Sequence, residues 1–146
     1  MAATLVEQLG KEPVRAEVIA ECCDLIDHQV KQKGFMIKTA YATIKALKKR
    51  FIPEVVDNML DDWLGKIQPH YEKWQGAPGT PFSDYIIARS DEVAEALLSV
   101  TDDRADKTSH TTAKKLYHRM RDGAKKNVIE AIPDLSRLIE KRLSNR

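Results

Sequence analysis

Apolar residues recur every three or four positions along most of the chain, and this spacing constrains the fold more than any other feature. Such spacing places the apolar residues on one face of an α-helix. No segment alternates apolar and polar residues between turn signals, which is the pattern of a strand. The sequence therefore predicts an all-α fold, a compact helical bundle of about six to eight helices. Between residues 14 and 30 the apolar positions are Val14, Val18, Ile19, Cys22, Leu25, Ile26 and Val30.

Capping and helix-breaking residues mark the ends of the predicted helices. Thr4 and Glu7 match a capping box that opens a short first helix. Pro53 suits the first turn of a later helix, and Pro69 ends or bends that helix. Thr80 is a predicted N-cap, because a proline follows it. The other helices are predicted over residues 14–30, 37–51 and 82–88, from Ser90 onward, over 111–121 and over 124–143, with an interruption at Asp122-Gly123 and a bend near Pro133.

The strongest break in the helical pattern is the segment 75–81, which reads Gln-Gly-Ala-Pro-Gly-Thr-Pro. The chain has 146 residues, the usual length of one domain. We therefore predict a single helical domain over 1–146, with 75–81 as a connector inside it.

The position of this connector near mid-chain suggests an internal repeat of residues 1–74 and 80–146. Three residues of the first part are identical to residues at matching positions in the second. Either the chain forms two pseudo-symmetric helical halves, or the similarity is that of any two amphipathic helices. The identical pairs are Glu17 with Glu92, Val18 with Val93, and Asp27 with Asp102.

Charge is nearly balanced overall but sorted along the chain. There are 24 Lys and Arg residues against 22 Asp and Glu, a net charge of +2, which is too small for general nucleic-acid affinity. Residues 12–30 carry five acids and one base, and residues 31–50 carry seven bases and no acid. Residues 84–106 carry seven acids and two bases, and residues 107–126 carry seven bases and one acid. In each half, a basic helix follows an acidic one.

The two basic helices, over 37–51 and 111–126, carry candidate anion-binding residues. Stripes of Lys and Arg neutralise the phosphates of a nucleic acid or of another anionic ligand. The alternative is that each basic helix packs beside acidic neighbours and its charges are matched there. The candidates are Lys38, Lys45, Lys49, Lys114, Arg121 and Lys125.

Tyr71 and Trp74, which lie between Pro69 and the connector, are candidate anchors for a partner. The alternative is that the two rings cover the seam between the halves, because a connector in mid-chain must pack on something. The sequence alone leaves both open.

No pattern of residues typical of catalysis or of a metal site is found. The four histidines lack the His-x-x-x-His and Glu-x-x-His spacings of helical metal sites. The acidic cluster 102–106 is typical of a magnesium site in outline, but a solvated acidic loop at a helix end fits it better. Cys22 and Cys23 are adjacent and are expected to be buried thiols. We predict no catalytic residue, no metal and no cofactor, and expect a protein that is not an enzyme.

The first residues form neither a basic leader nor an apolar segment, and no run approaches the 18 or so apolar residues of a spanning helix. We therefore expect a cytoplasmic location and no membrane partner.

Three stretches of sequence carry a resemblance to a known family. They are residues 37–41 (Ile-Lys-Thr-Ala-Tyr), 51–57 (Phe-Ile-Pro-Glu-Val-Val-Asp) and 91–102, which begins Asp-Glu-Val-Ala-Glu-Ala-Leu-Leu. Together they resemble a set of small, all-helical bacterial proteins classed only as a domain of unknown function. The resemblance implies a bacterial helical protein, and it brings no activity, ligand or site residue with it.

These observations favour a non-enzymatic interaction or structural module that acts through its helix faces, by binding an unknown protein partner or by self-association. A first alternative is binding of phosphate or nucleic acid through the helices 37–51 and 111–126. A second is a small apolar-ligand carrier or small enzyme, with its pocket between the two halves.

Overall fold

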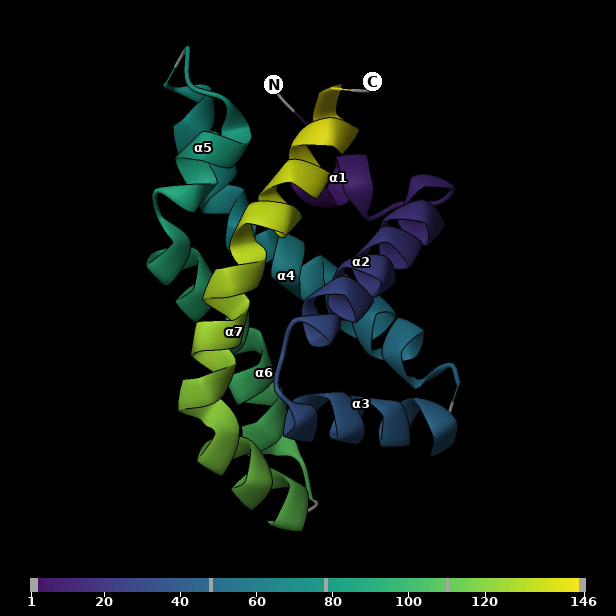
Figure 1. Cartoon of the computed structure of the whole chain (residues 1–146). Helices are drawn as coiled ribbons and strands as arrows, with labels where there is room; N and C mark the ends of the chain where they lie inside the picture. The colour runs from purple at the N-terminus through teal and green to yellow at the C-terminus, as the bar shows by residue number, and fades with distance from the viewer. Residues whose placement is uncertain (1–2, 48, 78, 110, 145–146) are drawn as a thin grey trace. The chain divides into compact units, whose positions relative to one another are not determined.

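The computed structural model describes residues 3–47, 49–77, 79–109 and 111–144 (Figure 1). These residues form seven helices and no strand, and 85% of the described residues are helical. The predictions of an all-α fold and of six to eight helices are therefore confirmed. The helices are α1 (Leu5–Leu9), α2 (Val14–Lys31), α3 (Phe35–Leu47), α4 (Phe51–Gln75), α5 (Phe82–Ile87), α6 (Ser90–Lys107) and α7 (Thr111–Ser144).

The chain divides into two compact units, Met1–Leu64 and Gly65–Arg146, which we call unit 1 and unit 2. The boundary lies inside α4, which contributes its first part to unit 1 and its second part to unit 2. Whether the chain is a single domain with a repeat of 1–74 and 80–146 stays a prediction.

Helix α1 begins at the capping box that the sequence predicts. The Thr4 hydroxyl accepts a hydrogen bond from the Glu7 amide at 3.1 Å, and the Glu7 carboxylate accepts one from the Thr4 amide at 3.1 Å. Two amides at the helix start, which have no partner within the helix, are satisfied in this way. Leu5 and Leu9 are then buried, and each stabilises unit 1 by roughly 1.5–3 kcal/mol.

Arg15 on α2 connects three segments of unit 1. Its guanidinium donates to the Asp57 carboxylate at 2.9 Å and to the Asp61 carboxylate at 2.7 Å, both on α4. It also donates to the backbone carbonyls of Gly10, at 2.9 Å, and Asp57, at 2.7 Å. Only 16% of the Arg15 side chain is exposed. The planar fork of five N–H groups can satisfy four acceptors at once, so Arg15 fixes the loop after α1 onto α2 and α4.

Gly10 occupies the tightest point of this arrangement. A Cβ at Gly10 would lie 2.8 Å from the Val6 carbonyl oxygen and 3.0 Å from an Asp61 carboxylate oxygen. The first of these atoms is backbone and cannot move aside cheaply. The tight last turn of α1 therefore favours glycine at this position, and the Asp61 carboxylate of α4 fills the remaining space.

Three residues of types that usually break helices lie inside helices of this chain. Helix α4 continues through Pro69 to Gln75, so this proline does not end the helix. Buried Ile67 and Tyr71 flank Pro69 and hold the turn in place. Similarly, α7 is continuous through Gly123, so the predicted interruption is wrong. Pro133 also lies inside α7, and the bend predicted near it stays a prediction. A glycine inside a helix costs only about 1 kcal/mol, which tertiary contacts on both sides offset.

The basic helix predicted over 37–51 is shorter than expected. Helix α3 ends at Leu47, and Phe51 begins α4. The basic segment 111–126 is the first part of the much longer α7. Helix α6 continues to Lys107, so the acidic cluster 102–106 lies within a helix and does not form the predicted loop at its end.

In unit 2, α6 and α7 lie side by side, and α5 packs against α7 (Figure 1). Residues late in α6 face residues early in α7, so the two helices are antiparallel. The connector is tightened by Gly79, whose φ of 90° favours glycine. Helix α5 begins at Phe82, as predicted, but its N-cap is Pro81 and not the predicted Thr80, and no side chain caps it. The Thr80 carbonyl accepts a hydrogen bond from the Trp74 indole N–H at 2.6 Å.

Replacing Arg15 by Lys should destabilise unit 1. The ammonium group keeps the charge but cannot reach four acceptors, so we expect the free energy of unfolding to fall by about 1–2 kcal/mol. Urea unfolding followed by Trp63 fluorescence, in a Trp74→Phe background, reports on unit 1. Arg119→Lys, at an exposed position of α7, is the control and should change little. Equal midpoints for Arg15→Lys and its parent would contradict this description of Arg15.

Candidate functional site

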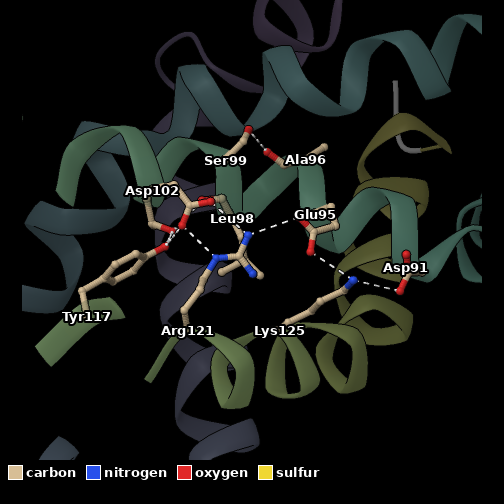
Figure 2. A network of polar contacts seen from close by, with 10 residues as sticks. Asp91, Glu95, Ala96, Leu98, Ser99, Asp102, Tyr117, Arg121 and Lys125 are labelled. Carbon is tan, nitrogen blue, oxygen red and sulfur yellow. Dashed lines mark hydrogen bonds and ion pairs between the residues drawn. The ribbon is translucent and has the colours of Figure 1, made fainter. Parts of the chain in front are cut away.

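The strongest polar cluster of unit 2 is the seam between α6 and α7 (Figure 2). Arg121 on α7 holds both oxygens of Asp102 on α6: its Nε donates at 2.8 Å and its Nη2 at 2.9 Å. The same Nη2 donates to Glu95 at 3.2 Å. A bidentate pair of this kind is stronger and more directional than a single ion pair. Arg121 therefore joins two successive acidic positions of α6 to α7.

Lys125 continues this seam one turn further along α7. Its Nζ lies 3.0 Å from Glu95 and 3.1 Å from Asp91 (Figure 2). Since Arg121 and Lys125 flank Gly123, they hold α7 to α6 on both sides of the residue that was predicted to interrupt it. We regard these contacts as the reason that α7 is continuous there.

Tyr117 extends the seam toward the start of α7. Its hydroxyl donates to Asp102 at 2.6 Å and lies 2.7 Å from the Thr101 hydroxyl. The hydrogen bonds from Arg121 and then Tyr117 lower the pKa of Asp102 below its ordinary value. Burial raises the pKa of Tyr117, and its hydrogen bond to Asp102 raises it further. At neutral pH the cluster therefore holds an ionised carboxylate between a cation and a neutral phenol.

Three predicted anion-binding residues on α7 are placed in or near this seam. Arg121 and Lys125 face acids of α6, as described above. Lys114 donates from Nζ to the Asp106 carbonyl oxygen at 3.3 Å. An anion that bound to Arg121 or Lys125 would have to displace a carboxylate already present. Anion binding at these positions stays a prediction, and their contacts favour a structural role.

Other bases of α7 point outward. Lys115, Arg119 and Lys126 are exposed and lie at positions i, i+4 and i+11 of the helix, on one face. The sequence prediction selected Lys114 and Lys125, each next to one of these exposed bases, because adjacent bases in a sequence do not indicate which of them faces α6. The exposed basic face of α7 is therefore a different set of residues from the predicted one.

Of the three candidate anion-binding bases in unit 1, one is paired and two are exposed. Lys45 lies 3.2 Å from Asp27 on α2, and its Nζ lies 5.3 Å from the centre of the Tyr41 ring. The Tyr41 hydroxyl also donates to Asp27. Hydrogen bonds from Tyr41 and then Lys45 lower the pKa of Asp27. Lys38 and Lys49 are exposed to solvent.

An aromatic residue that sequence reasoning missed lies at the start of α3. The Phe35 side chain is 82% exposed, more than either of the other large apolar side chains that the described residues expose, Phe51 (39%) and Met120 (53%). The apolar stripe that the sequence predicts for 37–51 consists of Ile37, Tyr41, Ile44, Leu47 and Phe51. Counted at 100° per residue, Phe35 lies about 160° from Ile37 around the helix axis. This off-stripe position is the signal that could have identified it.

The outer face of α3 continues from Phe35 with short side chains. Thr39, Ala42 and Ala46 follow at positions i+4, i+7 and i+11, and all three are exposed. These four residues fall within about 60° of one another around the helix axis. We call Phe35, Thr39, Ala42 and Ala46 the α3 outer face.

Tyr71 and Trp74, the predicted partner anchors, pack within unit 2. Tyr71 is 6% exposed, and its ring centre lies 5.8 Å from that of Trp74 and 6.2 Å from that of Phe82. Trp74 lies edge-on to Phe82 at 5.3 Å. These contacts close the connector 75–81, of which residue 78 lies outside the described part of the chain. A partner contact at these two residues stays a prediction, with Trp74 the more accessible of the two.

Within the described ranges, no group of three or more His, Cys, Asp or Glu side chains is arranged to hold a metal ion.

Cys22 and Cys23 are free thiols. Burial raises the pKa of Cys22 to about 12 and also raises that of Cys23, so the reactive thiolate is scarce at neutral pH. None of the helices in the part of the chain described combines the length and apolar composition needed to cross a bilayer.

The structure defines an all-helical protein in which the polar clusters described above hold its own helices together. The chain belongs to DUF6918, a family of unknown function whose profile matches residues 5–143. This confirms the resemblance to a helical family without assigned function, while the bacterial origin stays a prediction. No curated protein and no solved structure matches the chain.

Replacing Asp102 by Asn should lower stability in a pH-dependent way. The folded pKa of Asp102 lies below its unfolded value of about 3.9, so its contribution is present above that pH and is lost as the pH falls through the folded pKa. Because Asp102 is partly exposed, we expect a loss of only about 1 kcal/mol at pH 7 and a smaller difference below pH ~4.

Chemical unfolding followed by circular dichroism between pH 3 and 7 measures this difference. Asp103→Asn is the matched control, because Asp103 is the next residue of α6 and its ion pair with Lys107 is exposed. The control should change little at any pH. A pH-independent effect of Asp102→Asn, or an equal effect of both substitutions, would be inconsistent with the pairing described.

Proposed function

We propose that this chain is a non-enzymatic interaction module that binds a protein partner through the α3 outer face. The observation that carries this proposal is the exposure of Phe35, 82% of whose side chain meets water. Aromatic side chains are enriched among the residues that contribute most to protein–protein binding, and a partner pocket that buries Phe35 gains roughly 1.5–3 kcal/mol.

The rest of the outer face supports helix packing as the mode of binding. Thr39, Ala42 and Ala46 are short, so the backbone of a partner helix can approach α3 closely. Phe35 then extends beyond them as a single large side chain at one end. The reducing conditions of the cytoplasm, which we propose as the location, suit two free cysteines.

Binding of phosphate or nucleic acid is the second candidate. It is favoured by the bases that remain exposed. In unit 1 these are Lys38 on α3 and Lys49 just beyond the end of α3, and on α7 they are Lys115, Arg119 and Lys126. Against it, Lys45, Arg121 and Lys125 each lie within ion-pair distance of carboxylates. The number of bases available to phosphates is therefore smaller than the sequence indicates.

A pull-down from native lysate, with nuclease-treated and untreated arms, separates the two candidates. We expect wild type to capture at least one protein in both arms, and Phe35→Ser to lose it. Ala42→Leu, which enlarges the middle of the outer face, should lose it as well. Since all these residues are exposed, the variants should fold as wild type does, which circular dichroism checks.

Two matched controls make the result specific to α3. Met120→Ser removes an exposed apolar side chain from α7, and Ala20→Leu enlarges an exposed alanine of α2. Both should capture the same protein as wild type. Capture that survives Phe35→Ser, or that disappears after nuclease treatment, would count against the proposal.

A further inference from the structure

Exposed bases lie near the α3 outer face. Residues 31–50 contain seven bases and no acid. Of these bases, Lys45 is paired with Asp27 of α2, and the charge of Lys31 also acts on Asp27 and lowers its pKa. Lys38, Lys49 and Arg50 are exposed, and we call these three residues the basic rim. Any surface that covers Phe35 would approach this basic rim, so it gains affinity from carboxylates and loses it from bases.

The same charge argues against a second copy of the chain docked face to face. Two α3 outer faces in contact would bring two basic rims together, and like charges at an interface disfavour association. The occupant must therefore present charge opposite to that of α3.

The shape of the α3 outer face distinguishes between three kinds of negatively charged partner: a membrane, a nucleic acid and a protein helix. A helix that lies on an anionic membrane inserts several large apolar side chains, but Phe35 is the only large one on this face. Nucleic acid is bound by bases interleaved with aromatic rings, whereas the middle of this face is Thr39, Ala42 and Ala46. Short residues in a row suit the ridge of a second helix, which packs at an axial distance of about 8–10 Å.

We propose that the partner of α3 is an acidic amphipathic helix of another protein, an inference that rests on the function proposed above. Its apolar stripe covers Ala42 and Ala46, and Phe35 inserts between its side chains. Carboxylates that flank this stripe pair with Lys38 and with Lys49 just beyond the end of α3. Such binding weakens as salt increases, because the rim is exposed.

A displayed library of amphipathic helical peptides tests the inference. The peptides share an apolar stripe of Ala and Leu, and each flanking position is either Glu or Lys. Selection on the full-length chain should enrich Glu at the flanks. The enriched peptide, measured by fluorescence anisotropy, should bind at least tenfold more weakly to Phe35→Ser and to Lys38→Glu/Lys49→Glu.

Lys115→Glu/Lys126→Glu on α7 is the matched control, because it makes the same charge change at exposed positions of the other basic helix. It should leave peptide affinity within about twofold of wild type. Enrichment of Lys at the flanks, no enrichment at all, or equal binding to the α3 and α7 variants would overturn the inference. The inference would also be overturned if a single-stranded oligothymidine or phosphatidylglycerol vesicles bound the chain more tightly than the enriched peptide does.

These outcomes are separable from failure of the proposed function. Suppose that the lysate protein depends on Phe35 but is captured equally by Lys38→Glu/Lys49→Glu. The interaction module then stands, and the acidic partner is wrong. If capture is independent of Phe35, the proposed function itself fails.

Discussion

Opposite charge on successive helices is the constraint on which the arrangement of unit 2 depends. Along the seam, two bases of α7, Arg121 and Lys125, meet three acids of α6, and the antiparallel order of the helices brings them together. Arg121 is central because it binds Asp102 with two nitrogens and also reaches Glu95. Arg121 and Lys125 are structural in this arrangement, whereas Lys38 of α3 is exposed to solvent.

Much of the fold follows from the sequence, since apolar spacing and caps act locally. The capping box at Thr4 and the start of α2 at Val14 are where the sequence places them. The interruption predicted at Gly123 is wrong, because this residue lies inside α7, and Pro69 lies inside α4 and does not end it. A bend at Pro69 or Pro133 stays a prediction. A breaking residue costs a helix about 1–3 kcal/mol, and only the tertiary contacts on either side decide whether that cost is met.

The candidate site was harder to predict, for a geometric reason. Charge sorting predicts that α7 is basic, but Lys114 and Lys115 differ by 100° around the helix, and only the position of α6 decides which one points outward. Phe35 was missed because it lies off the apolar stripe of its helix, where an amphipathic pattern predicts a polar residue. An exposed residue that breaks the local pattern in this way is not explained by packing.

A double-mutant cycle on Asp102 and Arg121 tests the claim that these charges are structural. The free energies of unfolding of wild type, Asp102→Asn, Arg121→Met and the double variant give the coupling between the two side chains. We predict a favourable coupling of roughly 1 kcal/mol at pH 7, because the pair is bidentate and partly buried. A coupling below about 0.3 kcal/mol would show that the two residues act independently, and would contradict the account.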